Sequence, residues 1–243
     1  MVDAAHAPSQ MRTVSPALVY AGLIGLALAG LAASLLTGPA GYDLATIWQS
    51  LTVGAGPVVD AVVLDIRLPR ALTGFLVGAM LAASGAALQG YLRNPLAEPS
   101  VLGASNAAAL GAAIALYFGL WSIHPLALPL LAIAGAVLAL FLVITLARGA
   151  ESALTLILAG IAISTLCGAA ISLALNLSPN PFAALEITFW MLGSLQDRTM
   201  DHVVLAAPLM ALGFALILWD ARALDALSLG EDAATSLGFR LNR

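Results

Sequence analysis

Residues 71–92 read ALTGFLVGAMLAASGAALQGYL, a run without a single charged side chain. A helix of about 20 mostly apolar residues is long enough to cross the hydrocarbon core of a bilayer. Other stretches share this character, and the candidate spans lie near 17–36, 71–92, 99–121, 125–147, 153–177 and 203–219. The last is the shortest and contains Pro208, which a membrane helix tolerates where neighbouring groups satisfy the freed carbonyl. The sequence therefore predicts an all-α polytopic membrane protein with about six transmembrane helices.

The composition of the whole chain agrees with this class. Hydrophobic residues make up 61% and charged residues 9%, whereas a soluble domain carries roughly 25% charged residues. The nine basic residues are all arginine, and thirteen acidic residues bring the net charge to −4. Because no basic patch can form to neutralise phosphates, nucleic acid is excluded as a partner. The single cysteine, Cys167, lies in an apolar run and is expected to be a packing residue, and we expect no bound metal or cofactor.

The arginines predict how the chain crosses the membrane, because cytoplasmic loops are enriched in basic residues. With the N-terminus in the cytoplasm, six arginines face inward and three face outward. We therefore expect a cytoplasmic tail over 1–16, a transmembrane domain over 17–219 and a cytoplasmic segment over 220–243. The inward set is Arg12, Arg93, Arg148, Arg222, Arg240 and Arg243, and the outward set is Arg67, Arg70 and Arg198.

Two of the candidate spans carry rows of small residues at every fourth position. In lipid, helices approach each other closely where such residues form a flat face. We expect both rows to pack against other helices, although an alanine-rich chain also produces such rows by chance. The rows are Gly74, Gly78, Ala82, Ala86 and Gly90 in the second span, and Gly103, Ala107, Gly111, Ala115 and Gly119 in the third.

The polar residues at membrane depth are all uncharged serine, threonine, asparagine or glutamine residues. Serine and threonine at such positions often bond back to their own helix, so Gln89 and Asn106 are the stronger candidates for a pathway lining. No acidic or basic residue lies deep in a span, which argues against a proton- or sodium-coupled pump. Uncharged polar residues without buried ionisable groups fit a wide transport pathway, with the energy for transport supplied outside the membrane spans. The residues concerned are Ser84, Gln89, Ser105, Asn106, Ser164, Thr165 and Asn176.

The segment after the sixth candidate span contains the sequence Ser228-Leu229-Gly230-Glu231. This spacing predicts a capping box, in which the Ser228 and Glu231 side chains each satisfy a backbone amide of the other residue. Asp232 adds negative charge near the same helix end. The helix is expected to run to about Leu237 and to stop at Gly238. Such a helix either docks into a groove of a soluble partner or is an ordinary juxtamembrane helix, and both alternatives stay open.

An ordered series of motifs along nearly the whole chain resembles the FecCD/BtuC-like permeases for ferric siderophores, haem and cobalamin. No single piece is specific, but their order and spacing together are. The pieces are Arg67-Leu68-Pro69-Arg70, Gly78 to Ser84-Gly85, Leu88-Gln89, Arg93-Asn94-Pro95-Leu96-Ala97-Glu98-Pro99, Leu102-Gly103-Ala104-Ser105-Asn106, Leu158-Ala159-Gly160, Trp190-Met191-Leu192-Gly193-Ser194-Leu195 and Leu227-Ser228-Leu229-Gly230-Glu231 to Ser236-Leu237-Gly238.

The resemblance implies a BtuC-like permease fold in the bacterial inner membrane and a type II ATP-driven importer. Two permease subunits would form the pathway, two cytoplasmic ATPases would use the ATP, and a periplasmic binding protein would deliver the chelate. The segment Leu227–Gly238 resembles the coupling helix that contacts the ATPase. Asn94, Leu96 and Ser152 match places where the pathway narrows. Arg67 and Arg70 match arginines that meet carboxylates of the binding protein, and as residues alone they read equally well as interfacial anchors.

The chain departs from this family in length. Family members have roughly ten spans by the same hydropathy criterion, so the C-terminal spans are missing here. The sequence therefore resembles a fragment, a truncated gene or one half of a split permease.

Two rival functions follow from the residues. An ion-independent secondary transporter or channel-like protein fits the spans, but lacks buried ionisable groups. An intramembrane serine protease would pair Ser105 with His202. On the predicted topology these residues lie at opposite faces, and a proton cannot pass between them. We therefore expect the chain not to be an enzyme.

Overall fold

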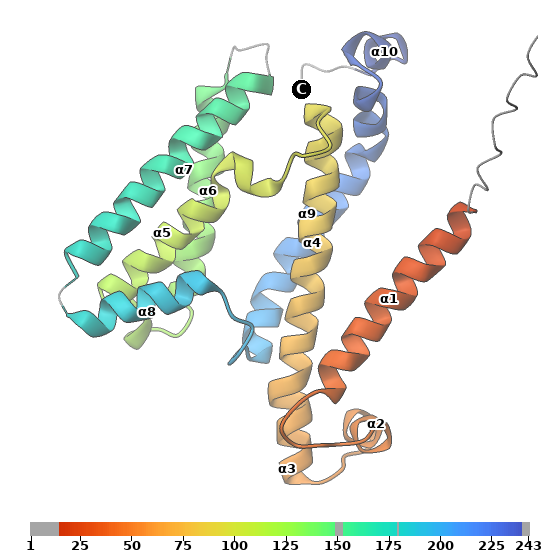
Figure 1. Cartoon of the computed structure of the whole chain (residues 1–243), viewed down its shortest axis with the longest axis vertical. Helices are drawn as coiled ribbons and strands as arrows, with labels where there is room; N and C mark the ends of the chain where they lie inside the picture. The colour runs from red at the N-terminus through yellow and green to blue at the C-terminus, as the bar shows by residue number, and fades with distance from the viewer. Residues whose placement is uncertain (1–14, 149–152, 179, 240–243) are drawn as a thin grey trace, which may run out of the picture. The chain divides into compact units, whose positions relative to one another are not determined.

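The computed structural model describes residues 15–148, 153–178 and 180–239, and every regular element in these ranges is a helix (Figure 1). The elements are α1 (Pro16–Leu36), α2 (Leu44–Thr52), α3 (Pro57–Asp60), the π-helical segment η1 (Ala61–Arg67), α4 (Leu68–Leu92), the 3₁₀ turn η2 (Pro99–Leu102), α5 (Ala104–Tyr117), the 3₁₀ turn η3 (Leu120–Ser122), α6 (Ala127–Leu146), α7 (Ala153–Asn176), α8 (Pro181–Leu192), α9 (Met200–Ser228) and α10 (Glu231–Ser236).

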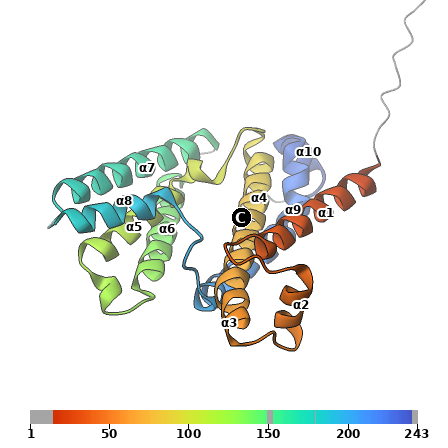
Figure 2. The ribbon, with the colours of Figure 1, turned by 60° about the horizontal axis from the view of Figure 1, so that its bottom comes forward.

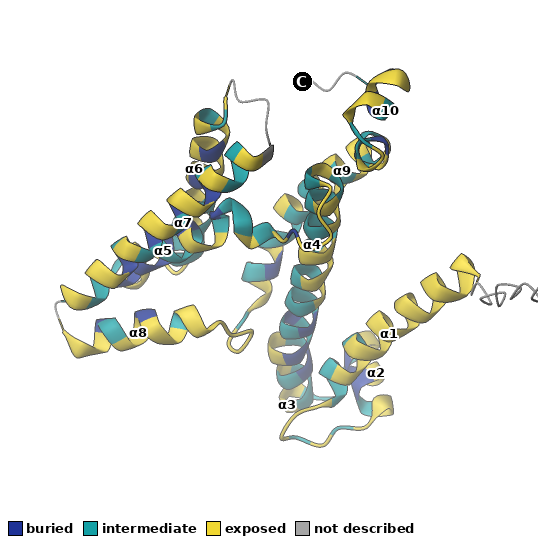
Figure 3. Ribbon diagram, turned by 45° about the horizontal axis from the view of Figure 1, so that its top comes forward, coloured by how far each residue is buried: buried dark blue, intermediate teal, exposed yellow. Residues whose placement is uncertain are grey.

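Several helical segments are long and apolar enough to cross a membrane. In the described part of the chain there are five, and few of their residues are buried, as the predominance of yellow and teal over dark blue in Figure 3 shows. Exposed apolar surface costs roughly 25 cal/mol per Å² in water, so these helices belong in lipid or against other membrane helices. The predicted all-α polytopic membrane class is confirmed. The segments are Pro16–Leu36, Pro57–Leu92, Ala127–Leu146, Leu154–Asn176 and Met200–Ser228.

The prediction of one continuous helix over 99–121 is wrong. Gly103 has φ +73°, in the left-handed region, and separates η2 from α5. Gly119, with φ +64°, follows the end of α5. The remaining helix has 14 residues, fewer than the about 20 that a span needs. A second difference concerns 203–219, which is the central part of the much longer α9.

The chain divides into two compact units, and the boundary falls inside α4 and α9. The first unit comprises Met1–Phe75 with Asp197–Val204, and the second comprises Leu76–Gln196 with Leu205–Arg243.

Two acidic side chains organise the connections of the first unit. The Asp43 carboxylate accepts the Thr46 backbone N–H at 2.9 Å and caps α2. Hydrogen bonds from the Thr46 side chain and backbone hold the pKa of Asp43 below its ordinary value. Asp60 accepts the Ser50 hydroxyl at 2.6 Å and the Ala55 N–H at 2.9 Å. Both carboxylates fix the turns on either side of α2, because they satisfy backbone and hydroxyl donors that a loop leaves free.

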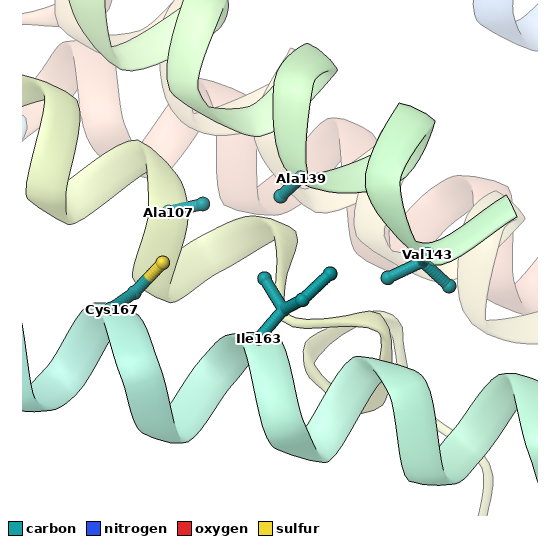
Figure 4. Close-up of a cluster of buried hydrophobic side chains, with 5 residues drawn as sticks. All are labelled: Ala107, Ala139, Val143, Ile163 and Cys167. Atoms are coloured by element: carbon teal, nitrogen blue, oxygen red, sulfur yellow. The ribbon is translucent and has the colours of Figure 1, made fainter. Parts of the chain in front are cut away.

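In the second unit, α5 is the central helix and lies against α6, α7 and α8 (Figures 1 and 2). Its core is made of small and branched side chains that meet between α5, α6 and α7 (Figure 4). A second cluster joins α5 to α7 and α8. The members of the first cluster are Ala107, Ala139, Val143, Ile163 and Cys167, and those of the second are Ala113, Leu116, Ile171 and Ile187.

The small-residue row of α5 makes close contacts between backbones, as predicted. A Cβ atom added at Gly111 would lie 2.1 Å from the Leu131 carbonyl oxygen of α6. From the other side, a Cβ at Gly135 would lie 2.3 Å from the Ala107 carbonyl oxygen. No side chain fits at such distances, so glycine is required at both positions for α5 and α6 to pack as they do.

The corresponding row of α4 behaves differently. A Cβ atom added at Gly78 or Gly85 would meet no described atom within 4 Å. Gly90, at the end of the row, lies near another helix, with its added Cβ 3.5 Å from the Leu224 carbonyl oxygen of α9. Packing of Gly78 against another helix stays a prediction, since no atom of the described chain lies close to it.

Candidate functional site

The turn that follows α4 brings three of the predicted pathway residues together. The backbone N–H of Asn94 donates to the Gln89 carbonyl at 3.2 Å, and the Leu96 N–H donates to Asn94 Oδ1 at 2.9 Å. Gln89 Nε2 also donates to the Ala97 carbonyl at 3.4 Å. These bonds close residues 93–97, here named the α4 turn, onto the end of its helix. Leu96 is left 85% exposed at its tip.

The other predicted pathway residues are distributed over separate elements. Asn106, in the first turn of α5, donates from Nδ2 to Ser164 Oγ of α7 at 2.6 Å. Ser105 beside it is exposed. Ser84 bonds back to the Met80 carbonyl at 2.7 Å, which is the local helix contact that serine commonly makes. Ser152 lies outside the described residues. Gln89, Asn94 and Leu96 thus form one cluster, whereas Ser84 and Asn106 each have a contact of their own.

The predicted coupling segment contains a short helix, but its start differs from the prediction. Helix α9 continues through Leu227 to Ser228, whose hydroxyl donates to the Asp225 carbonyl at 2.6 Å. The N-cap of α10 is Gly230, with φ +113°, and no side chain caps it. The capping box between Ser228 and Glu231 is therefore wrong, because Ser228 is used to end the preceding helix.

The end of α10 is as predicted. Gly238 has φ +87°, and its N–H donates to the Thr235 carbonyl at 2.9 Å. The Phe239 N–H donates to the Ala234 carbonyl at 3.1 Å. This pair of bonds is a Schellman motif, which stops a helix at a left-handed glycine. Ala234 is fully buried, while Leu229 and Leu237 are exposed. Helix α10 is therefore packed on one side and flanked at both ends by exposed apolar side chains.

An ion pair that the sequence did not predict joins the α4 turn to α10. Arg93 Nη2 lies 3.0 Å from Glu231 Oε1. The two residues are 138 positions apart, and no local spacing connects them. Arg93 itself has φ +50°, a left-handed conformation that few non-glycine residues adopt.

The two predicted docking arginines are both bound to the end of α1. Arg67 donates to the carbonyls of Leu35 at 2.9 Å and Leu36 at 3.2 Å. It also donates to the Ala40 carbonyl, and its guanidinium lies 5.2 Å from the centroid of the Tyr42 ring. A cation at this position satisfies the unpaired carbonyls and the negative end of a helix.

Arg67 and Arg70 differ in burial. Arg67 is 2% exposed in this chain, so its guanidinium is used by the carbonyls around it. The docking role of Arg67 and the alternative of an interfacial anchor both stay predictions. Arg70 is partly exposed, and its Nη2 donates to the Ser34 and Thr37 carbonyls at 3.3 Å; its docking role stays a prediction.

The rival site for proteolysis gains no support from the geometry. His202 Nδ1 lies 2.9 Å from Thr199 Oγ1, within its own helix start. Among the described residues, no group of three or more His, Cys, Asp or Glu side chains could hold a metal ion. The polar geometry found is therefore that of turns and helix ends.

Comparison with known proteins agrees with this description. The model of the FecCD transport family matches residues 26–243. The cobalamin import system permease protein BtuC of Halobacterium salinarum is 37% identical over 207 residues, covering 81% of this chain and 55% of the relative. The ferric enterobactin transport system permease protein FepD of Escherichia coli is 37% identical over 240 residues, covering 95% and 69%.

A solved structure described as a metal-chelate type ABC transporter in an inward-facing conformation matches with a TM-score of 0.78 and 31% identity, covering 93% of this chain and 69% of that one. The chain is shorter than these relatives and spans 52%, 55% and 58% of the length of three curated ones. The family match nevertheless covers far more than half of the present sequence. This chain, a multi-pass membrane protein, therefore belongs to the FecCD transport family.

Proposed function

We propose that the chain is the permease subunit of a type II ATP-driven importer that moves an iron chelate or cobalamin across the bacterial inner membrane. The observation that carries the proposal is the geometry of α10, a short helix ended by a Schellman motif with Leu229 and Leu237 exposed. A rigid element of this kind transmits a movement of a soluble partner to the spans, whereas a flexible tail does not. Relatives named for cobalamin and for Fe(3+) dicitrate import support the substrate class.

The proposed assembly contains a second permease subunit, a cytoplasmic ATPase that uses the ATP, and a periplasmic binding protein. The ATPase would contact α10 through its exposed leucines. The pathway would be lined by Gln89 of α4, by Asn94 and Leu96 of the α4 turn, and by Asn106, which is bound to Ser164. Ser84, Ser105 and Ser152 are weaker members of this proposed lining, since Ser84 bonds to its own helix.

The orientation of the chain is tested by cysteine labelling in intact cells. In a Cys167→Ala background, Val53→Cys should react with an impermeant maleimide because we propose that α2 and its loops face the periplasm. Leu96→Cys should react only after the membrane is opened. Both side chains are well exposed, so accessibility within the fold does not limit either reaction. Labelling of Leu96→Cys in intact cells would contradict a cytoplasmic N-terminus.

Docking of a binding protein is tested at Arg70. Arg70→Glu should weaken capture of a periplasmic chelate-binding protein, and capture by the wild-type chain should fall as salt rises, because exposed charge pairs are screened. Arg198→Glu serves as a comparison at another predicted outer arginine. Equal capture by wild type and Arg70→Glu would assign Arg70 to the end of α1 alone. Uptake into vesicles that lack ATP would instead favour a secondary transporter.

A further inference from the structure

The ion pair between Arg93 and Glu231 connects the two parts of the molecule that the proposed function uses. Arg93 is the first residue of the α4 turn, whose tip is the exposed Leu96. Glu231 is the first residue of α10. The charged groups are 3.0 Å apart, and covalently they are separated by 138 residues. A displacement of α10 therefore reaches the turn far more directly through this contact than along the chain.

Both sides of the contact are internally fixed. The α4 turn is closed by the bonds of Asn94 with Gln89 and Leu96, so Arg93 cannot shift without carrying Leu96 with it. On the other side, the α10 N-cap Gly230 has φ +113°. A Cβ atom added there would lie 4.0 Å from Arg93 Nη1. Each partner thus belongs to a segment held together by its own hydrogen bonds, those of Asn94 on one side and those that end α10 on the other.

The helices that carry the two segments, α4 and α9, also approach each other at two points. An added Cβ at Gly90 would be 3.5 Å from the Leu224 carbonyl oxygen, and one at Gly213 would be 3.3 Å from Met80 Cε. The ion pair therefore lies just beyond the approach of Gly90 to Leu224, where a hinge movement of α9 and α10 would displace the end of α4.

The exposure of the pair argues against a role in stability. The side chains of Arg93 and Glu231 are 48% and 61% exposed, and ion pairs this open to solvent contribute little to folding and weaken with salt. Arg93 nevertheless keeps a left-handed backbone, φ +50°, which is uncommon for a side chain of its size. A left-handed Arg93 that makes a weak, exposed ion pair with Glu231 is what we expect of a contact that forms and breaks during transport.

We propose that Arg93 and Glu231 are positioning residues that couple α10 to the α4 turn, so that an ATP-driven displacement of α10 moves Leu96. This inference rests on the proposed function, in which α10 contacts the ATPase. The link requires opposite charges at 93 and 231 but not a particular residue at either position. Charge reversal of both partners therefore preserves it, whereas neutralising one partner removes it.

The test follows the environment of Leu96. The 243-residue chain carries Cys167→Ala and Leu96→Cys with an environment-sensitive bimane label, and ABC ATPase subunits of the source organism are added at saturation with and without a non-hydrolysable ATP analogue. Wild type should give an ATP-dependent emission change. Glu231→Gln should lose it, Arg93→Glu with Glu231→Arg should regain it, and high salt should reduce it. Asp232→Asn is the matched control, since it removes one charge from the same helical turn and should keep the response.

Binding of the ATPase is measured for each variant in a parallel pull-down. An undiminished emission change in Glu231→Gln, with the ATPase bound, overturns the link and leaves the proposed function intact. Loss of ATPase binding in Glu231→Gln also overturns it, because Glu231 would then be a docking residue. Absence of ATPase binding to the wild-type chain rejects the proposed function and this inference together. A purely structural role would lower thermal stability in Glu231→Gln and in the charge reversal alike, without restoring the response.

Discussion

Gly111→Leu is expected to yield little or no folded protein. A Cβ at this position would already lie 2.1 Å from the Leu131 carbonyl oxygen and 3.2 Å from the Ala132 Cα, and these are backbone atoms that cannot rotate away. Overpacking of a tight core costs about 1–3 kcal/mol for modest insertions, and a whole leucine side chain between two helix backbones exceeds that range. Gly111→Ala should be the milder version, folded but less stable. Both effects are measured by membrane yield and by thermal unfolding of the purified protein in detergent.

Gly78→Leu provides the control for this prediction. It makes the same chemical change in a helix of the same unit, but no described atom lies within 4 Å of the added Cβ. We expect yield and thermal stability close to wild type for the isolated chain, and Gly78→Ala should be neutral or slightly stabilising because alanine favours the helix. If Gly111→Leu folds as well as Gly78→Leu, the close approach of α5 and α6 is wrong.

Arg67→Ala is expected to be the most damaging single change in the first unit. It removes the donors for the Leu35 and Leu36 carbonyls at the end of α1 and one of the two donors to the Ala40 carbonyl, which keeps the Tyr42 N–H. Hydrogen bonds from charged groups contribute about 1.5–3 kcal/mol each, so the free energy of unfolding should fall by roughly 3 kcal/mol or more. Arg67→Lys should rescue only part of this loss, since an ammonium group cannot reproduce the planar fork.

The loss should be local as well as global. Hydrogen exchange of the last turn of α1 and of residues 38–42 should become faster in Arg67→Ala than in Arg70→Ala, because Arg70 makes only two longer contacts. Gly38→Ala gives an independent test of the same geometry. Its Cβ would lie 2.6 Å from Arg67 Nη2, so it should loosen the same region without removing a charge. Unchanged exchange in both Arg67→Ala and Gly38→Ala would contradict the buried position of Arg67.

The sequence predicted the helical membrane class because long uncharged apolar runs leave few alternatives. It failed at 99–121, where hydropathy averages over a break that depends on the backbone angle of Gly103. It also assigned Ser228 to a capping box from local spacing, whereas the preceding helix extends far enough to use that serine itself. At Gly103 and at Ser228 alike, the point where a neighbouring helix ends decided the structure, and the local sequence pattern did not.

The site was less predictable than the fold. Gln89, Asn94 and Leu96 were predicted together because they lie close in one recognisable motif, and hydrogen bonds join them in the structure; their place in a pathway stays a prediction. The contacts of Arg67 could not be predicted, since an arginine that binds backbone carbonyls 27 to 32 residues away has the same sequence signature as one at a surface.

The rows of α4 and α5 were equally regular, yet added Cβ atoms at Gly103 and Gly111 would meet the backbone of neighbouring helices, whereas one at Gly78 meets no atom of the described chain within 4 Å. Which positions of a row are covered depends on tertiary packing.

The central claim is that this chain acts on an ATPase through α10. The most direct measurement compares capture of ABC ATPase subunits by the chain ending at Ser228, which keeps α9 and lacks α10, and by a matched chain ending at Phe239, which keeps both. We expect the longer chain to retain the ATPase and the shorter one to bind it about tenfold more weakly, a difference of ~1.4 kcal/mol. Leu229→Glu with Leu237→Glu in the full chain should give the same loss without truncation. Equal capture by all of these proteins would contradict α10 as the docking element and, with it, the assignment to an ATP-driven importer.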